Sequence, residues 1–256
     1  MCLIFTAINY HPVYKLIVAA NRDEFYNRKT AAANYWPDYP DVLGGRDLQA
    51  GGTWMGMTTS GKIAMLTNYR DPKNIRPDAP SRGFLVSDYL EHNVTAEEYL
   101  KTIEPAKYNG FNLILGDVDS LYYLSNYREG IAHLPNGLFG LSNALLDVPW
   151  PKVVRGKKKL APILGKSDLT TAELMEFLYD TEVATENLPS TGVSADLEKA
   201  LSSMFIKTPG YGSRCSTVVL VDKSNHVKFS ERVYDLDTFN YTLSEYEFDF
   251  HAKNAK

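Results

Sequence analysis

The sequence predicts an α+β domain in which two antiparallel β-sheets pack between two layers of helices. Two observations support this expectation. Apolar, β-branched segments are joined by tight turns, a pattern typical of antiparallel sheets. Blocks of such strands alternate along the chain with blocks of helical periodicity, which favours a layered α+β architecture. A four-layer αββα sandwich is one arrangement that satisfies both observations.

The N-terminal part of the chain predicts two hairpins. Residues 2–8 and 14–20 are apolar runs separated by a turn, and residues 53–68 form a second hairpin around the turn "TTSG". Residues 21–52 lie between the hairpins and are rich in Asn, Asp, Pro and Gly, so they predict a long irregular stretch. Long loops in compact domains are often functional. Residues 69–81 predict a further loop.

The rest of the chain supplies the helices and the remaining strands. Helical spacing of apolar residues predicts helices over 81–93, 95–103, 151–164, 170–183 and 194–205. Two of them begin with a capping box, Thr95 with Glu98 and Thr170 with Glu173. Strands are expected over 111–117, 121–127, 137–143, 215–222, 227–235 and 244–250.

Composition and charge exclude several classes of function. The 256 residues carry a net charge of −4, which does not favour a nucleic-acid partner. No apolar run has the length of a membrane span, and no signal peptide is recognisable, so we expect a cytoplasmic protein. Without a linker or a repeat, we expect one domain over 1–256. The sequence does not indicate an oligomeric state.

The cysteines and histidines do not form a metal-binding pattern. Cys2 and Cys215 are the two cysteines, which is neither a disulfide framework nor a zinc-site spacing. The five histidines are scattered along the chain: His11, His92, His133, His226 and His251. We therefore expect no required cofactor and no metal. Cys215 predicts a packed thiol, with a redox-labile pair with Cys2 as the alternative.

Cys2 directly follows the initiator methionine. Removal of Met1 would expose an α-amino group with a pKa of roughly 8, which can accept the proton of the neighbouring thiol. One residue would then supply both nucleophile and base, as in N-terminal nucleophiles. The alternative is a buried small hydrophobic residue, the usual state of a cytosolic cysteine.

Polar residues follow directly after the predicted buried strand 14–20. They are Asn21, Arg22, Asp23 and Glu24. Antiparallel pairing of the first hairpin brings this segment beside Cys2, so Asp23 is expected to hold the α-ammonium group or to order a substrate. Arg22 is expected to favour the thiolate or to bind an anion. The alternative is an exit turn with a surface ion pair.

Three further strand ends carry residues of the same kind. Asn68 and Asn143 follow buried runs, and an Asn side chain at such a place can donate to a developing oxyanion. Asn68 is equally suited to a turn. Arg214 begins a buried strand and needs a partner, for which a substrate carboxylate is suitable. Trp54 is either a pocket wall or a core residue, and Arg70 is a further candidate ligand-binding residue.

Taken together, these motifs resemble the NRDE family, also called the transport and Golgi organization protein 2 family. The motifs are Met1-Cys2, "NRDE", "GGRD", "GGTW", "TNYR", "SRG", "FNL", "GLSN", "WPK" and "YGSRCSTV", from residue 1 to about 220. The family in turn resembles the cysteine branch of the N-terminal-nucleophile hydrolases, which includes penicillin V acylase and conjugated bile salt hydrolase.

This resemblance implies a four-layer αββα fold and cleavage of a small non-peptide C–N amide. It matches Cys2 to the nucleophile, Asp23 to a strand-end aspartate and Asn68 to the oxyanion asparagine. Asn143 and Arg214 complete the expected catalytic set, and Asn21, Arg22, Glu24, Trp54 and Arg70 are the expected ligand-binding residues. The family resemblance also implies an alternative: a non-catalytic carrier of a hydrophobic anionic ligand, either haem or acyl-coenzyme A.

Overall fold

The computed structural model describes residues 2–250. Its strands are β1 (Cys2–Ile8), β2 (Tyr14–Phe25), β3 (Thr30–Tyr35), β4 (Val42–Asp47), β5 (Met55–Thr58), β6 (Lys62–Asn68), β7 (Phe111–Asp117), β8 (Ser120–Ser125), β9 (Ala132–His133), β10 (Gly137–Leu141), β11 (Lys207–Thr208), β12 (Tyr211–Asp222), β13 (His226–Tyr234) and β14 (Tyr241–Asp249). Its α-helices are α1 (Phe84–Glu91), α2 (Ala96–Thr102), α3 (Pro151–Ile163), α4 (Thr171–Leu178) and α5 (Ala195–Ala200). Short 3₁₀ turns cover Pro72–Asn74 and Pro105–Lys107.

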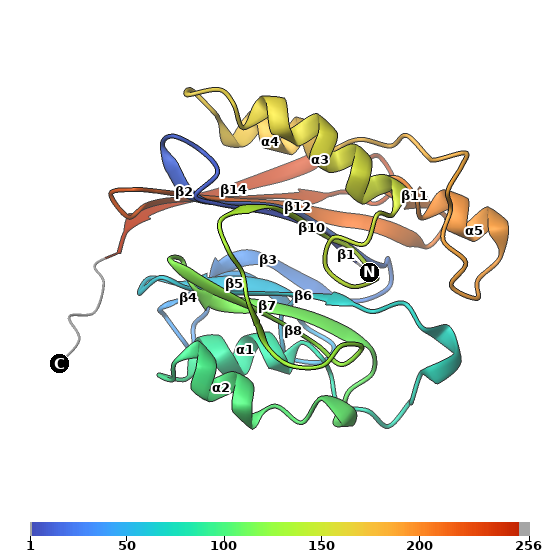
Figure 1. Cartoon of the computed structure of the whole chain (residues 1–256), viewed down its shortest axis with the longest axis horizontal. Helices are drawn as coiled ribbons and strands as arrows, with labels where there is room; N and C mark the ends of the chain where they lie inside the picture. Colours follow the sequence, from blue (N-terminus) through green and yellow to red (C-terminus); the bar gives the residue numbers. More distant parts are fainter. Residues whose placement is uncertain (1, 251–256) are drawn as a thin grey trace.

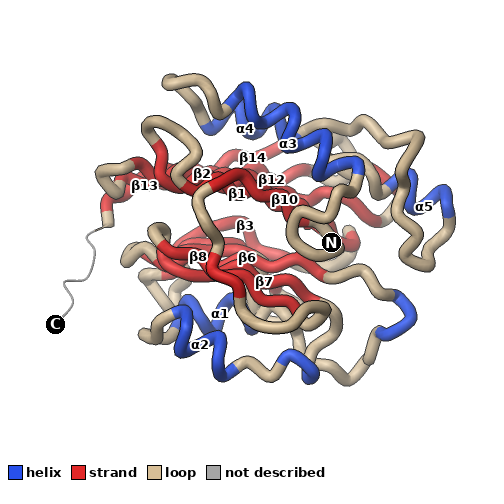
Figure 2. The backbone as a smooth tube through the Cα atoms, in the orientation of Figure 1, coloured by secondary structure: helices blue, strands red, loops and turns tan. Residues whose placement is uncertain are grey.

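The strands form two antiparallel sheets that pack face to face (Figure 1). The first sheet has the order β10-β1-β2-β12-β13-β14, with β11 paired to β12. The second runs β3-β4-β5-β6-β7-β8-β9, so each of its strands pairs with the next one along the chain. Figure 2 shows the two sheets as the middle layers and the helices as the outer layers. The expected αββα sandwich is confirmed.

Three apolar clusters hold the four layers together. One lies between the sheets and includes Ile4, Val18 and Met65. The second joins the first sheet to α3 and α4, and the third joins the second sheet to α1 and α2. Alternate residues of β1 and β2 enter the first and second clusters, because both faces of this sheet are covered. Both strands therefore read as nearly continuous apolar runs.

Several local predictions are confirmed. β1 and β2 form the first hairpin, and β5 and β6 form the second. Both capping boxes are present, at Thr95 before α2 and at Thr170 before α4. The predicted helix over 194–205 is shorter than expected, since α5 ends at Ala200. Among residues 2–250, we find no helix long and apolar enough to cross a membrane.

The expectation of an irregular stretch over 21–52 is wrong. β2 continues to Phe25, and β3 and β4 follow it as the edge of the second sheet. A break in register between Ala31 and Asn34 frees the backbone of Ala33 from the β3–β4 ladder. The N–H of Ala33 donates to Glu231 at 2.6 Å, and its carbonyl accepts from the Tyr246 hydroxyl at 2.8 Å. The two sheets are thus joined by hydrogen bonds as well as by packing.

Candidate functional site

Cys2 is the first described residue of β1, in the interior of its sheet. In the antiparallel pairing of β1 with β2, it lies opposite Arg22, and Arg22 lies opposite Cys215 on β12. The expected approach of Cys2 to the end of β2 is therefore confirmed. Only 8% of the Cys2 surface is exposed, and the residue lines a cavity at the ends of these strands.

The alternation of side chains along β2 distributes the four polar residues at its end. Arg22 follows the phase of Val18 and Ala20, which face the second sheet, so Arg22 lies on the same side of the sheet as Cys2. Asn21 follows Ala19, which packs under the helices. Asp23 shares the phase of Asn21, and its carboxylate accepts a hydrogen bond from Ser213 of β12 at 2.6 Å.

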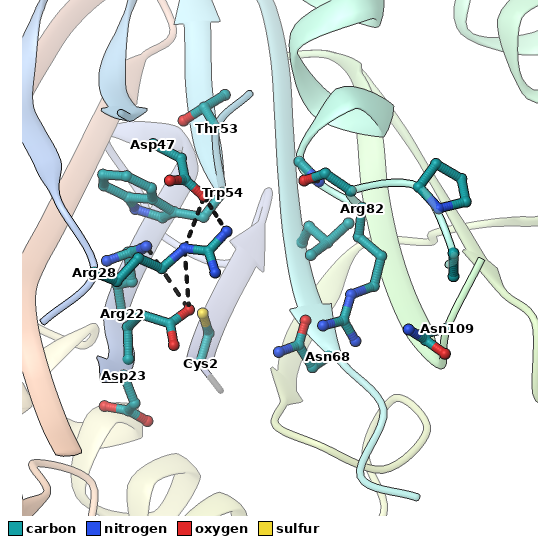
Figure 3. A pocket seen from close by; sticks show the side chains of 16 residues that line it. Cys2, Arg22, Asp23, Arg28, Asp47, Thr53, Trp54, Asn68, Arg82 and Asn109 are labelled. Carbon is teal, nitrogen blue, oxygen red and sulfur yellow. Dashed lines mark hydrogen bonds and ion pairs between the residues drawn. The ribbon is translucent and has the colours of Figure 1, made fainter. Parts of the chain in front are cut away.

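The cavity has a volume of about 270 Å³. One wall is made by the first sheet, with Cys2, Arg22 and Glu24. The opposite wall is made by Asn68 at the end of β6 and by Arg82 just before α1. Figure 3 shows the Asn68 and Arg82 side chains directed toward Cys2 across the cavity. The site is thus assembled from both sheets.

A network of charged and aromatic side chains surrounds the cysteine. The Arg22 guanidinium lies 4.2 Å from the centre of the Trp54 ring, so Trp54 forms a wall of the site and not only part of the core. Glu24 lies 3.9 Å from both Arg22 and Arg28. Arg28 in turn binds Asp47 through two nitrogens, at 2.9 and 2.5 Å. The network, drawn in Figure 3, fixes the Arg22 side chain beside Cys2.

Asn68 is positioned by Asn143. The Asn143 side chain is fully buried and donates from Nδ2 to the Asn68 carbonyl at 2.8 Å. The backbone of Asn143 accepts from the N–H of Arg70, the second residue after β6. The loop after β10 therefore holds the end of β6, and with it the Asn68 side chain, in place.

A second group of charges lies on the helix side of Cys2. Lys152, in the first turn of α3, is 1% exposed, and its Nζ makes no hydrogen bond with residues 2–250. Burial lowers the pKa of Lys152 to about 8, although the nearby Asp23 carboxylate acts in the opposite direction. Burial raises the pKa of Asp23, while Lys152 and the hydrogen bond from Ser213 oppose this rise. Each of the two groups therefore favours the charged form of the other.

The surroundings of Cys2 favour the protonated thiol. Burial raises its pKa, and the Asp23 carboxylate raises it further. Arg22 and a backbone hydrogen bond from Asp23 favour the thiolate, but they do not outweigh these effects. A nucleophilic role consequently requires a base close to the sulfur.

Comparison with known proteins places the chain in a family. The family model described as Transport and Golgi organisation 2 matches residues 1–236. The chain belongs to the transport and Golgi organisation 2 family. Homologues of that name from mouse and human are each 37% identical to it, over 97% of this chain and 99% of the relative. The Drosophila protein of the same name is 33% identical, over 90% of this chain and 91% of its own.

Among solved structures, the chain is similar to an N-acylethanolamine-hydrolyzing acid amidase ortholog from Caenorhabditis elegans. The TM-score is 0.51 at 13% identity, over 86% of this chain and 92% of the amidase chain. At this identity the likeness concerns the fold alone. This member of the transport and Golgi organisation 2 family therefore has the αββα fold of the N-terminal-nucleophile hydrolases.

Six of the ten predicted site residues of this family member line the cavity: Cys2, Arg22, Asp23, Glu24, Trp54 and Asn68. The catalytic and binding roles assigned to all ten stay predictions. Met1, on which the nucleophile hypothesis depends, lies outside the described residues.

The other four predicted residues are placed around the cavity rather than in its lining. Asn143 supports Asn68. Asn21 donates to the carbonyls of Leu178 and Met204 on the helix side of the sheet. Arg70 pairs with Glu198 at 2.7 Å, and both side chains are buried.

Arg214 is the remaining one, and a bulge explains its position. The register of β12 against β2 shifts between Ser213 and Cys215, so Arg214 leaves the alternation of the strand. Its Nη1 donates to the carbonyls of Phe25, Tyr26 and Arg28, at 2.8, 2.9 and 2.7 Å. Arg214 thus orders the turn after β2 through these three carbonyls.

Sequence reasoning missed several residues of the site. Arg28 and Asp47 lie in the stretch that predicted a loop. Arg82 belongs to the motif "SRG", but no role was predicted for it. Lys152 did carry a signal, since residues 152, 156 and 160 recur at helical spacing and all three are buried. A lysine in that apolar stripe indicates a buried charge.

The alternative of a redox-labile pair between Cys2 and Cys215 does not fit the structure. The two residues lie on either side of Arg22, two strands apart, which separates their Cα atoms by roughly 10 Å. A disulfide requires about 7 Å or less. Both cysteines are free and buried.

Proposed function

We propose that this protein is an N-terminal cysteine nucleophile amidohydrolase that cleaves a small non-peptide C–N amide. The observation that supports the proposal best is the position of Cys2. It begins a central strand, lines a cavity, and faces the Asn68 side chain across it. The fold shared with an amidase agrees with this activity without establishing it.

The reaction proposed for this site has two halves. After loss of Met1, the Cys2 α-amine takes the thiol proton and the thiolate attacks the amide carbon. Asn68 and a backbone N–H stabilise the oxyanion, while Asp23 orders the α-ammonium. The C–N bond breaks as the leaving amine accepts a proton, which leaves a thioester on Cys2. Water then hydrolyses the thioester and regenerates the thiol.

The high pKa of the Cys2 thiol supports the need for this arrangement. Since burial keeps the sulfur protonated, a base that arises only at the exposed N-terminus would activate it on maturation. The carboxylate of Asp23 disfavours a second negative charge nearby but favours an ammonium group. Its position on the helix side of Cys2 therefore suits a partner of the α-amine better than a partner of the sulfur.

Intact-mass spectrometry of the native protein tests the first step. We expect a mass that lacks Met1. If every molecule retains Met1, the proposed mechanism is wrong.

Turnover of a panel of N-acyl amides tests the chemistry. Replacement of the nucleophile by Cys2→Ala should lower kcat by roughly three orders of magnitude or more. Loss of the oxyanion donor in Asn68→Ala should lower it about a hundredfold. Cys215→Ala serves as the matched control and should retain activity. Equal activity of Cys2→Ala and the unchanged protein would contradict the proposal.

The carrier of haem or acyl-coenzyme A is the second candidate, supported by the arginines that line the cavity. The cavity is small for such ligands, because ligand pockets usually measure about 300–1,000 Å³. Titration with haem and with acyl-coenzyme A distinguishes the two candidates. Saturable micromolar binding in a protein that turns over no amide would favour the carrier.

A further inference from the structure

Arg82 is held rigidly at the rim of the cavity. The segment before α1 packs against the turn after β4, where the Thr53 N–H donates to the Gly83 carbonyl at 3.3 Å. The approach is so close that a Cβ on Gly52 would lie 2.5 Å from the carbonyl carbon of Gly83. The backbone beside Arg82 consequently has little freedom, and its side chain projects into the cavity next to Asn68 (Figure 3).

The other charges of the cavity have partners. Arg28 is bound to Asp47, and Glu24 lies between Arg22 and Arg28. Asp23 is turned toward Ser213 and the helix layer.

Arg82 differs from them. Its guanidinium makes one hydrogen bond, from Nη1 to the Gly110 carbonyl at 2.9 Å, and no ion pair with another residue of 2–250. An arginine carries five N–H donors, so most of this group is available to a ligand.

The environment of Arg82 favours an anionic partner. Burial lowers the pKa of the guanidinium, which means that water solvates its charge poorly there. The group nevertheless stays charged at physiological pH. An oxyanion that enters the cavity would offset this loss of solvation and accept charge-assisted hydrogen bonds in a forked geometry.

We propose that the cavity takes a substrate with an oxyanionic group, a carboxylate or a phosphate, close to the scissile amide, and that Arg82 binds this group opposite Cys2. The inference deepens the proposed function and rests on it. In a cavity of about 270 Å³, the anionic group and the reacting carbonyl lie within one small molecule. Asn68 then donates to the carbonyl oxygen of the amide, and Arg82 binds the anionic group.

A different role for Arg82 is to stabilise the oxyanion of the reaction itself. The kinetic constants of Arg82→Gln for a neutral amide distinguish the two roles. If Arg82 binds the substrate's own anion, Arg82→Gln should raise KM for anionic amides much more than KM for neutral amides. An equal fall in kcat for both kinds of amide would assign Arg82 to the reaction oxyanion and overturn this inference, with the proposed function intact.

Alkylation of Cys2 tests the subsite without any turnover. Iodoacetate and iodoacetamide are similar in size and carry a carboxylate or a neutral amide next to the reacting carbon. A change between variants in the ratio of their rate constants at Cys2 therefore measures attraction of the anion. Peptide mapping separates Cys2 from Cys215. We expect Arg82→Gln to lower the iodoacetate-to-iodoacetamide ratio at Cys2 by about tenfold, the effect of one lost charge-assisted hydrogen bond. Arg82→Lys should retain most of the ratio.

Arg128→Gln is the matched control. Arg128 is exposed, and its Nη1 also donates to a backbone carbonyl, that of Gly130, but it lies outside the cavity. This variant removes the same net charge and should leave the ratio unchanged. An unchanged ratio in Arg82→Gln, or an equal fall in Arg128→Gln, would overturn the inference.

Calorimetry on the Cys2→Ala protein gives an equilibrium measure and separates the two anions. The probes are succinamide, which is neutral, succinamate, which carries a carboxylate, and 3-phosphonopropionamide, which carries a phosphonate in place of a phosphate. At least one anionic probe should bind about tenfold more tightly than succinamide, and Arg82→Gln should remove the difference. The tighter anion identifies the class. Equal binding of all three probes contradicts the subsite even if the enzyme proves to be an amidase.

Discussion

At the residue scale, strand alternation assigns different tasks to neighbours at the end of β2. Arg22 and Glu24 lie on the cavity side, where Arg22 stacks on Trp54 and sits opposite Cys2. Asn21 donates to the Leu178 carbonyl and so ties the sheet to the helix layer. Asp23 belongs to the lining of the cavity and also interacts electrostatically with the buried lysine of α3, Lys152. A motif of four consecutive residues thus serves two layers of the molecule.

Lys152 should give the stability of the protein a distinct pH dependence. In the unfolded chain its pKa is the ordinary 10.5, whereas in the folded protein it is about 8. Between these pH values the unfolded state binds more protons, so the free energy of unfolding rises with pH. Relative to that of Lys152→Met, the free energy of unfolding of the unchanged protein should rise by up to about 1.4 kcal/mol per pH unit over this interval.

Denaturant unfolding between pH 7 and 10.5 measures this difference. Lys158→Met, on the exposed side of the same helix, is the control. Its free energy of unfolding should change with pH as that of the unchanged protein does. If the free energy of unfolding of Lys152→Met shows the same dependence on pH as that of the unchanged protein, the pKa of Lys152 is not lowered.

At the element scale, α3 approaches β1 more closely than an ordinary side chain permits. A Cβ on Gly156 would lie 2.0 Å from the Phe5 ring. The glycine therefore sets the distance between the helix and the strand that carries Cys2, and it brings Lys152, one turn earlier, down to the sheet.

Gly156→Ala should destabilise the protein, although alanine favours the helix by about 1 kcal/mol. Overpacking at such a site typically costs about 1–3 kcal/mol. Because Phe5 is itself held in the core, the net effect should be a lower free energy of unfolding. Gly165→Ala, where the nearest atom to the new Cβ is 3.4 Å away, is the control and should change stability little. Thermal unfolding of both variants checks the expectation, and equal melting temperatures would refute it.

Much of the fold is predictable from the sequence, because long apolar runs and capping boxes mark most elements. β3 and β4 were missed since alanine, asparagine and glycine, which have low β propensity, make up much of them. The strand-end position of Cys2, Asp23 and Asn68 was also predictable from the runs that precede them. Arg82 and the bulge at Arg214 were not, because their places depend on contacts between distant segments.

At the scale of the whole molecule, the cavity exists because two separate sheets meet. Cys2 belongs to one sheet and Asn68 to the other, and the core cluster between the sheets fixes their distance. On the side of β3, the pairing of the sheets is reinforced by the bonds of Ala33 to Glu231 and Tyr246. The geometry of the site is therefore sensitive to how the sheets are held together.

Tyr246→Phe should lower the free energy of unfolding by about 1 kcal/mol, because it leaves the Ala33 carbonyl without its hydroxyl partner. Tyr241→Phe makes the same change on an exposed residue of the same strand and should have little effect. Urea unfolding of the two variants provides the measurement. Equal values for both would show that this bond between the sheets contributes nothing to stability.

The amide proton of Ala33 also records a motion that no ladder proton records. A proton within a ladder can exchange with deuterium when one strand peels from its neighbour. The proton of Ala33 is bonded to the opposite sheet, so it is released when the two sheets part at this edge. Its exchange rate in the native protein therefore measures how often the sandwich opens, and the passage of a ligand between its halves can be compared with that rate.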